Sequence, residues 1–580
     1  MGTISDKLMR IISTKEDIRQ ALISKGYDVP TSIPFKEYAK MILDLPCKAD
    51  SFPDIEGIVA RYSASGLTNE QMAANPVWVD KTGNGHDLQM KNLAWGGMSG
   101  VGGYKLNWSD SNTWANYIVQ GVYGTGEVTD NTIHITNAKT YNALFETKTS
   151  LKSVEYKVLI KGLTDDIYLR YGVFNDGKEL WTEIKNDGIY TLPSYDYDSR
   201  YNMKWKVMSQ TYPIDCNITI EQLPLYPGAL VFDGVDDYGT CDNFPILTKE
   251  KGYTVVALRQ WITYNPNAIS AIATNASDQS FNGAFTFENY NKGAEQTISY
   301  GATQISLQYS KSPFSWQTTS KYNGVNIANG NKDATNSLVL GRSYPQRNDF
   351  AIWELVFLDH DATEEELTKI KDYFVKTYPW LFPDQAWTTV GKTNEDEDRA
   401  TIANITGNGN DLVLSNLGFA EGSGYNEEGE YAGYLVTDGV DDKVEGSPFT
   451  LNKDWTIVGN WTMLSNIPSN CGIIKVSSMF LYNSLDGVTI YFAGGPIKIQ
   501  SKSINAFCSD GRIYLNDWTE ILKPDAQIAS GGSKSSLNIA FYGTNFTKMA
   551  FKNLAIYDGK NLSKDDCIKA YNYLQTIKSK

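Results

Sequence analysis

The sequence predicts a mainly β protein that contains two related domains, the first of which is interrupted by an inserted domain. Two motifs recur in the same order: TGNGHDL at 82–88 precedes FDGVDDY at 232–238, and TGNGNDL at 406–412 precedes TDGVDDK at 437–443. A repeated pair of motifs indicates a duplicated module, and we call its two occurrences the first copy and the second copy. The chain is also rich in Gly (48) and Tyr (36), which favours strands joined by turns.

The bulk composition excludes several classes of protein. The 580 residues suffice for roughly three to five domains, each with its own core. A net charge of −15 argues against a nucleic-acid partner, because such binders carry a basic stripe. The start lacks a signal-peptide pattern and no run approaches about 18 apolar residues, so we expect cytoplasmic synthesis and no membrane insertion. The cysteines form no CxxC pair and are expected to be reduced and mostly buried: Cys47, Cys216, Cys241, Cys471, Cys508 and Cys567.

Residues 1–50 are predicted to form a helical attachment region that differs from the rest of the chain. Ser13-Thr14-Lys15-Glu16 is a capping-box pattern, and Gly26 predicts the end of the first short helix. A second helix is expected to begin near Ser32 and to end at Pro46. Two such helices cannot bury a core alone, so they must pack on another copy of the chain, on another protein or, as a cap, on the next domain.

The first copy is expected at 51–103 and 228–378, on either side of an insertion. Between its two motifs it carries about 120 residues more than the second copy does. Residues 104–227 contain alternating strands, such as 153–160 and 216–220, without a convincing helix. They predict a small β-sandwich inserted at a surface loop, which we call the guest.

Each copy is expected to end in a strand followed by an amphipathic helix. In the first copy, strand 353–358 precedes a capping box at Thr363–Glu366, and the predicted buried stripe is Leu367, Ile370, Tyr373 and Phe374. In the second copy, strand 551–557 precedes an N-cap at Ser563, and the predicted stripe is Ile568, Tyr571 and Leu574. Prolines predict a linker at 379–386, and the second copy then occupies 387–580.

The Asp-rich motifs predict hairpin corners. Gly234 and Gly439 permit tight turns, and the neighbouring aspartates can accept hydrogen bonds from their own turn amides. Calcium, which prefers carboxylate oxygens, is the alternative, but five residues offer too few ligands at a defined spacing, and we assign no metal. The second copy has Thr437 in place of Phe232 and Lys443 in place of Tyr238, which weakens any shared ligand more than it weakens the shared fold.

These features resemble concanavalin A-like lectin/glucanase domains of the laminin-G-like type. The resemblance rests on 230–238, on the preceding 82–88 and on the final strand with its capped helix, and the second copy repeats all three. It covers 58–103, 228–378 and 387–580. It implies two jelly-roll sandwiches of antiparallel sheets, the first interrupted by the smaller guest sandwich.

The N-terminal stretch is similar to short helical leaders on tail and fibre proteins of phages. This resemblance implies a fibre or decoration of a tailed phage, made in the bacterial cytoplasm and displayed on the virion surface. The implied partners are other virion proteins, through residues 4–46, and further copies of the chain, with a homotrimer favoured over a dimer. Host-surface polysaccharide is a further expected partner.

No catalytic site or cofactor is predicted, and we expect that the chain is not an enzyme. The E-x-D-x-x-E spacing of glycan hydrolases with a related fold does not occur. Its nearest match, Asp359–Glu364, lies at a strand-to-helix corner, where its carboxylates are expected to cap the helix. His86, His134 and His360 are scattered, and His86 becomes Asn410 in the second copy, as expected of a turn position.

Three functions therefore stand after the sequence analysis. A structural virion protein leads, a carbohydrate-binding adhesin or receptor-binding protein is the alternative, and a glycan hydrolase comes third. Tryptophans in or near predicted loops are candidates for stacking on sugar rings, although no carbohydrate site can be defined from sequence: Trp95, Trp108, Trp114 and Trp181.

Overall fold

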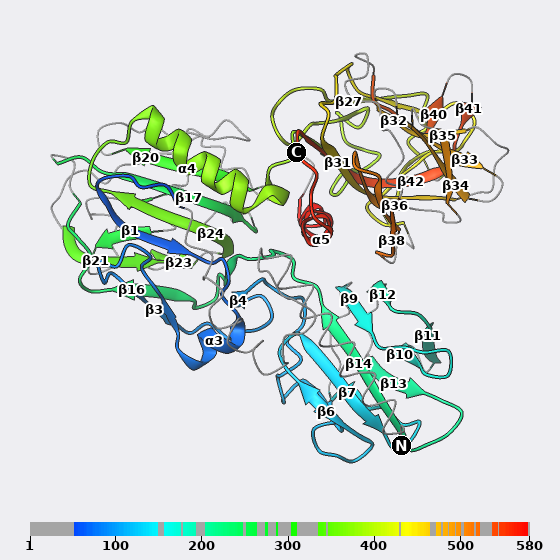
Figure 1. Ribbon diagram of the computed structural model, residues 1–580, viewed down its shortest axis with the longest axis horizontal. Coiled ribbons are helices and arrows are strands. Elements are labelled where there is room, and N and C mark those ends of the chain that lie inside the picture. Colours follow the sequence, from blue (N-terminus) through cyan, green and yellow to red (C-terminus); the bar gives the residue numbers. More distant parts are fainter. Residues whose placement is uncertain are drawn as a thin grey trace, which may run out of the picture.

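The architecture comes from a computed structural model of the chain, which is mainly β, as the sequence predicts (Figure 1). All the strand pairs within its named sheets are antiparallel in the described part of the chain. No helix there is long and apolar enough to span a membrane. The predicted leader at 4–46 lies outside the described residues. These are 52–577 apart from 149–155, 176–177, 193–202, 248–250, 264–272, 277–285, 288–302, 310–333, 344–345, 348, 421, 428–430, 465–470, 477–478, 485–486, 493–494, 500–503, 516–517, 523–535 and 543–544.

Two sheets make up the first copy. One runs β20 (Gln304–Tyr309), β17 (Thr254–Trp261), β24 (Asp349–Leu358), β15 (Leu230–Asp233) and β4 (Gly100–Val101), with β1 (Ile58–Ser63) also on β24. The other runs β19 (Thr286–Phe287), β18 (Ala273–Ala276), β21 (Ala334–Leu340), β16 (Tyr238–Cys241), β3 (Leu88–Lys91) and β2 (Val77–Trp78). A short helix, α3 (Asn69–Ala74), and the hairpin of β22 (Arg342–Ser343) and β23 (Gln346–Arg347) complete it. Both sheets contribute to one buried apolar cluster, so this copy has its own core.

The guest strands lie between β4 and β15 in the chain and also form two sheets. One runs β11 (Lys178–Ile184), β10 (Tyr168–Asn175), β13 (Met203–Met208), β8 (Phe145–Thr147) and β5 (Trp114–Asn116). The other runs β12 (Gly188–Leu192), β9 (Tyr156–Lys161), β14 (Ile214–Gln222), β7 (Thr132–Ala138) and β6 (Gly124–Val128). A separate cluster of buried side chains fills the space between them. Gly102 donates its amide to the Ala229 carbonyl at 2.8 Å, so the two ends of the insertion lie next to each other.

The second copy repeats this layout of paired sheets. One runs β28 (Gly424–Tyr425), β29 (Leu435–Val436), β42 (Met549–Asp558), β31 (Trp455–Met463), β36 (Ile504–Cys508), β37 (Arg512–Leu515) and β38 (Glu520–Leu522), with β25 (Gln385–Thr388) also on β42. The other runs β26 (Thr401–Ile402), β27 (Leu412–Ser415), β30 (Lys443–Glu445), β39 (Asn538–Ile539), β32 (Cys471–Val476), β33 (Met479–Ser484), β34 (Gly487–Phe492) and β35 (Gly495–Ile499). The hairpin of β40 (Phe541–Tyr542) and β41 (Asn545–Phe546) follows β39. β25 begins inside the range predicted as a linker, because Gln385 already pairs with Ile556.

Both copies end in the predicted strand and helix. α4 (Glu364–Thr377) has the capping box of Thr363 and Glu366, and its buried residues are the four predicted ones. α5 (Lys564–Leu574) is N-capped by Ser563. One threonine fixes the entry to each helix: the Thr254 hydroxyl donates to the His360 carbonyl, and the Thr456 hydroxyl donates to the Lys560 carbonyl.

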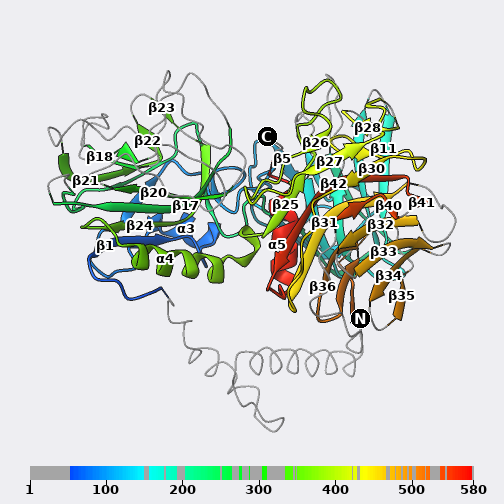
Figure 2. The same cartoon turned by 90° about the horizontal axis from the view of Figure 1, so that it is seen from above.

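The two copies share a continuous apolar cluster, which we call the seam. It joins α4, the 3-10 turn η1 (Pro379–Leu381) and α5, and Figure 2 shows α5 between the two copies. Trp380 is only 5% exposed, and its carbonyl accepts a hydrogen bond from the Tyr557 hydroxyl at 2.7 Å. The guest reaches the seam as well, since Lys157 Nζ lies 4.0 Å from the ring centroid of Tyr571. The residues between the copies are therefore packed rather than a free tether.

Candidate functional site

The repeated Asp-rich turns are built in the same way in both copies. In the first, the Asp233 amide donates to Asp237 Oδ2 at 2.9 Å and the Val235 amide donates to Asp233 Oδ1 at 2.7 Å. In the second, the Asp438 amide donates to Asp442 Oδ2 and the Val440 amide donates to Asp438 Oδ1, both at 2.7 Å. The aspartates thus bind their own turn amides, as the sequence predicts.

A distant loop completes each turn. The Ser99 hydroxyl donates to Asp237 Oδ1 at 2.9 Å, and the Asn92 amide group donates to the Asp236 carbonyl at 3.2 Å. In the second copy, Ser423 and Asn416 make the matching bonds to Asp442 and to the Asp441 carbonyl, both at 3.0 Å. In the first copy the turn therefore joins the segment after β3 to the segment before β16. In the second copy it joins the segment after β27 to the segment before β30.

Burial perturbs the inner carboxylate of each turn. Asp237 is only 2% exposed, and this desolvation raises its pKa to about 7. Burial raises the pKa of Asp442 as well. Both oxygens of each inner carboxylate already accept a hydrogen bond, so these groups act first as turn acceptors.

Each turn gathers three carboxylates that could approach a cation. Oxygens of Asp233, Asp236 and Asp237 lie within 4.8 Å of one another, and Asp438, Asp441 and Asp442 repeat the arrangement. Calcium takes six to eight oxygens, whereas the innermost carboxylate here is already engaged by an amide and a serine. We assign no metal to either turn.

The exposed surface beside the turns differs between the copies. Tyr238 is the first residue of β16 and is half-buried. Lys91 Nζ lies 5.6 Å and Arg342 Cζ lies 5.0 Å from the centroid of its ring. Lys443 occupies the equivalent position on β30, and its Nζ lies 5.7 Å from the Phe541 ring and 6.0 Å from the Phe546 ring. An aromatic ring between cations in one copy thus becomes a cation between aromatic rings in the other.

In the first copy, the other repeated motif, 82–88, lies at the opposite end of the β3–β16 pair from the Asp-rich turn. Asp80 accepts hydrogen bonds from the Thr82 hydroxyl and the His86 amide, and Gly83 and Gly85 have positive φ. β3 pairs with β16 so that Lys91 faces Tyr238, which places this turn beyond Leu88, away from the Asp-rich turn. The structure does not bring the two motifs together into one site.

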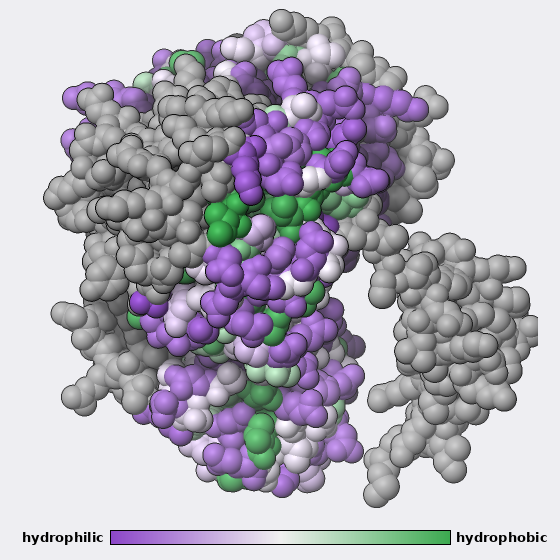
Figure 3. Space-filling view, turned by 90° about the vertical axis from the view of Figure 1, so that its left-hand side faces the viewer, coloured by the Kyte–Doolittle hydropathy of each residue, from purple (hydrophilic) through white to green (hydrophobic). Residues whose placement is uncertain are grey.

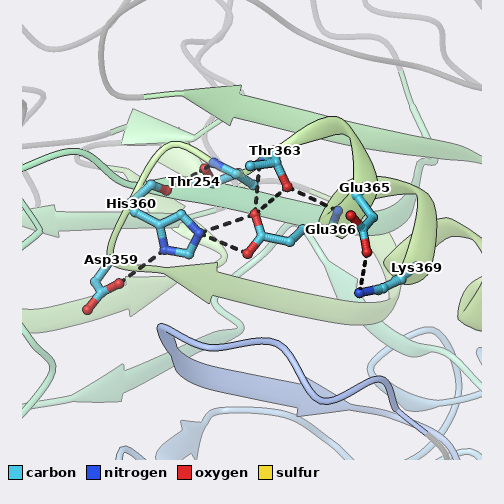
Figure 4. A network of polar contacts seen from close by, with 8 residues as sticks. Thr254, Asp359, His360, Thr363, Glu365, Glu366 and Lys369 are labelled. Atoms are coloured by element: carbon cyan, nitrogen blue, oxygen red, sulfur yellow. Dashed lines mark hydrogen bonds and ion pairs between the residues drawn. The ribbon is translucent and has the colours of Figure 1, made fainter.

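The three histidines remain apart, and His360 has the richest surroundings (Figure 4). His360 Nδ1 lies 3.2 Å from Asp359 Oδ1, and Nε2 lies 3.2 Å from Glu366 Oε1. Partial burial lowers the pKa of His360, but the bonds to both carboxylates outweigh this effect and the net shift is upward. Glu366 also closes the capping box with Thr363, so this network fixes the start of α4.

The candidate tryptophans separate into core and surface residues. Trp108 and Trp114 are buried in the guest core, so neither can stack on a sugar. Trp95 is half-buried at a turn with φ 52°, and Trp181 is half-exposed on β11. Among the cysteines whose side chains are described, Cys241, Cys508 and Cys567 are buried and Cys216 is half-buried, and all four are free.

Comparison with known proteins gives only distant likenesses. No protein-family model matches the chain, and no curated protein matches it. Trypanosoma rangeli sialidase is similar at 9% identity and a TM-score of 0.26, over 79% of this chain and 85% of that chain. The receptor-binding domain of botulinum neurotoxin type G is similar at 9% identity and a TM-score of 0.21, over 59% of this chain and 97% of that one. Another receptor-binding domain matches at 9% identity and a TM-score of 0.23, over 56% of this chain and 84% of that one.

These likenesses correct one expectation. The expectation that the chain is not an enzyme is contradicted, because sialidases are among the similar structures. The absence of one carboxylate spacing does not exclude hydrolysis, because glycan hydrolysis is also achieved with other residues. At these TM-scores the likenesses assign no activity, and the exclusion of catalysis is withdrawn.

Proposed function

We propose that this chain is a structural protein of a tailed-phage virion, a fibre or decoration whose lectin-like β domains bind carbohydrate on the host surface. In this proposal, 51–103 with 228–378 and 387–580 are jelly-roll domains of the concanavalin A-like type, and 104–227 folds as a separate sandwich. The protein is made in the bacterial cytoplasm and displayed on the particle. Neither nucleic acid nor membrane insertion has a part in it.

One observation carries the carbohydrate-binding part of the proposal. The two copies keep the same turn bonds, yet the half-buried residue beside each turn changes from Tyr238 to Lys443, together with its neighbours. The fixed turn bonds hold both positions in the same place, so each copy can present a different side chain to a ligand. Aromatic side chains stack on sugar rings, and cationic side chains pair with the acidic groups that some sugars carry.

The rest of the surface is consistent with recognition by polar and aromatic groups. The face seen in Figure 3 is mostly hydrophilic in its described part, with smaller hydrophobic patches between polar ones. Among the described residues, Val235 and Val440 stand exposed at the tips of the two Asp-rich turns. Single exposed valines are ordinary, so they do not by themselves define an interface.

The virion part of the proposal rests on the leader. Residues 4–46 carry two predicted amphipathic helices that need an external partner, and we propose that they attach the chain to other virion proteins. We also propose that three copies meet around this leader. Deleting 1–46 should abolish incorporation into particles without lowering the melting temperature of the remaining chain. Normal incorporation of the deleted protein would refute the attachment.

A glycan array of the full chain tests the binding part. We expect selective binding, with Tyr238→Ala and Lys443→Ala each removing part of it, and Tyr141→Ala serving as an exposed control in the guest. An array without any bound glycan would refute it. Since catalysis is not excluded, release of reducing ends is measured on the bound glycans in the same experiment.

A further inference from the structure

One face of the guest combines an aromatic platform with a local excess of cations. β10 and β13 alternate between core and solvent: Leu169, Tyr171 and Trp205 are buried, whereas their neighbours point outward. Figure 1 shows β10, β11 and β13 together in the lower part of the molecule, on the sheet of the guest that does not carry Lys157. We call this outward surface the guest face. Its members used below are Glu146, Tyr168, Arg170, Trp181, Glu183, Lys185, Lys204 and Lys206.

Trp181 packs over Gly172 of the neighbouring strand. Gly172 is its register partner, and a Cβ at Gly172 would lie 2.4 Å from Cζ3 and 2.6 Å from Cε3 of the indole. Only glycine therefore leaves room for the ring at this height above β10. Lys206 reaches over from β13, with its Nζ 4.5 Å from the ring centroid. The arrangement holds the indole against β10, with an ammonium group over its ring.

The charges on the guest face are opposite to those of the chain as a whole. Arg170 pairs with Glu183 at 2.5 Å, and Lys204 lies 3.9 Å from Glu146. Lys206 stands over Trp181, and Lys185 Nζ lies 5.6 Å from the Tyr168 ring as well as 3.1 Å from Glu183. Among the described side chains of this face, four cations thus accompany two carboxylates, whereas the chain as a whole has a net charge of −15. Such a patch attracts an anion that the rest of the surface repels.

We propose that the guest face binds an acidic glycan whose carboxylates meet Lys204 and draw Lys206 off the indole, so that a sugar ring stacks on the outer side of Trp181. The inference rests on the proposed function and adds a second glycan site, with its ligand class, on the guest. Stacking on an indole suits the flat apolar side of a pyranose, and the paired Arg170 and Glu183 offer donors and acceptors for hydroxyl groups.

Two other readings explain less of this surface. An aromatic ring over a glycine also supports a strand, but that role requires no cations around it. Single-stranded nucleic acid stacks on aromatic residues too, but its continuous phosphates need a basic groove without interspersed carboxylates. Glu183 and Glu146 stand between the cations here, so a glycan with separated acidic groups fits better.

Titration of the full chain with defined polysaccharides tests the proposal. Polygalacturonate is the acidic probe, dextran the neutral probe and poly(dT) the nucleic-acid probe. We expect polygalacturonate to bind and to weaken as salt rises, because exposed charge pairs are screened. Trp181→Ala should lower its affinity about tenfold or more, which corresponds to loss of a stacking contact. Gly172→Ala, which pushes the indole off the sheet, should act in the same direction.

Matched variants separate binding from folding. Tyr141→Ala removes an exposed aromatic ring of the guest that lies outside this face, and Lys161→Gln removes an exposed lysine from the opposite sheet. Both should bind polygalacturonate as the unmodified chain does, whereas Lys206→Gln should bind several-fold more weakly. Melting temperatures of all variants are recorded, so that a loss of folding is not read as a loss of binding.

Several results would overturn the inference. Dextran or poly(dT) binding as tightly as polygalacturonate would do so, and so would a Trp181→Ala variant that melts earlier but binds unchanged. A chain that binds acidic glycans on the array equally well with and without Trp181 would refute this site and leave the proposed function standing. Silence of the whole array would refute the proposed function itself.

Discussion

Replacing Trp380 with alanine should destabilise both copies at once. Trp380 is 5% exposed in the seam, packs edge-on against Tyr378 with ring centroids 5.6 Å apart, and has Lys569 Nζ 4.5 Å from its ring. Truncating a buried Trp costs about 3–5 kcal/mol. The lost cation–π contact adds roughly 0.5–1 kcal/mol. Since the side chain belongs to the cluster that joins α4 and α5, the loss should be felt on both sides.

Hydrogen-exchange mass spectrometry can follow this prediction, because peptides report each copy separately. At about 1.4 kcal/mol per factor of ten, the combined loss of about 3.5–6 kcal/mol should make opening roughly two and a half to four orders of magnitude more frequent. We expect faster exchange in peptides from α4 and β24 as well as in those from α5 and β42. Trp455→Ala is the matched control, since Trp455 is 2% exposed but lies in the core of the second copy alone. If Trp380→Ala accelerated exchange in only one copy, the shared seam would be refuted.

Three further perturbations test the electrostatics of the fold. Burial raises the pKa of Asp237 to about 7, so the folded chain keeps a proton that the unfolded chain has lost. The free energy of unfolding should then fall by at most about 4 kcal/mol as pH rises from 4 to 7. Urea titrations of Asp237→Asn at several pH values should lack this dependence on pH. If the variant kept the same dependence, Asp237 would not be its source. Glu354→Gln should cost about 3–5 kcal/mol in chemical denaturation, because buried Glu354 pairs with Arg61 at 3.3 Å, and a loss under 1 kcal/mol would contradict this. The carboxylates around His360 raise its pKa in the folded chain. The stabilisation from its contact with Glu366 is therefore fully present below pH 6.5 and is lost as pH rises through the folded pKa. An NMR titration that gave His360 a pKa below 6.5 would contradict this.

Local chemistry made part of the fold predictable from sequence. The capping box of Thr363 and Glu366 and the stripe that follows it were readable, because both depend on residues within a few positions of one another. The aspartates of the repeated turns were expected to accept their own amides, and Val235 donates to Asp233 in this way. Repetition then fixed which segments correspond between the copies.

Contacts between distant segments were not predictable in this way. Ser99 reaches Asp237 across 138 positions, and neither residue is marked by its local sequence as the partner of the other. The prolines near 379–386 predicted a linker, whereas Trp380 is buried because α5, almost two hundred residues later, packs on it. A proline indicates where a helix ends, but it does not indicate whether a distant segment packs on the residues that follow.

The candidate glycan site at Trp181 is partly predictable from sequence and partly not. Trp181 is one of four tryptophans in or near predicted loops, and its local sequence does not distinguish it from Trp108 and Trp114, which lie in the guest core. The distinction depends on the register that places Gly172 opposite Trp181 and on Lys206 two strands away. A register is set by pairing across the sheet, so the signal appears only once the strands are aligned.

The most direct test of the central proposal is immunogold electron microscopy of purified phage particles with antibodies against residues 387–580. The account predicts gold label at one defined position on intact particles, and loss of that label from particles assembled with the chain lacking residues 1–46. It also predicts that soluble polygalacturonate and the antibodies each reduce adsorption of particles to host cells. Particles that carry no label, while the protein accumulates free in the lysate, would contradict the account.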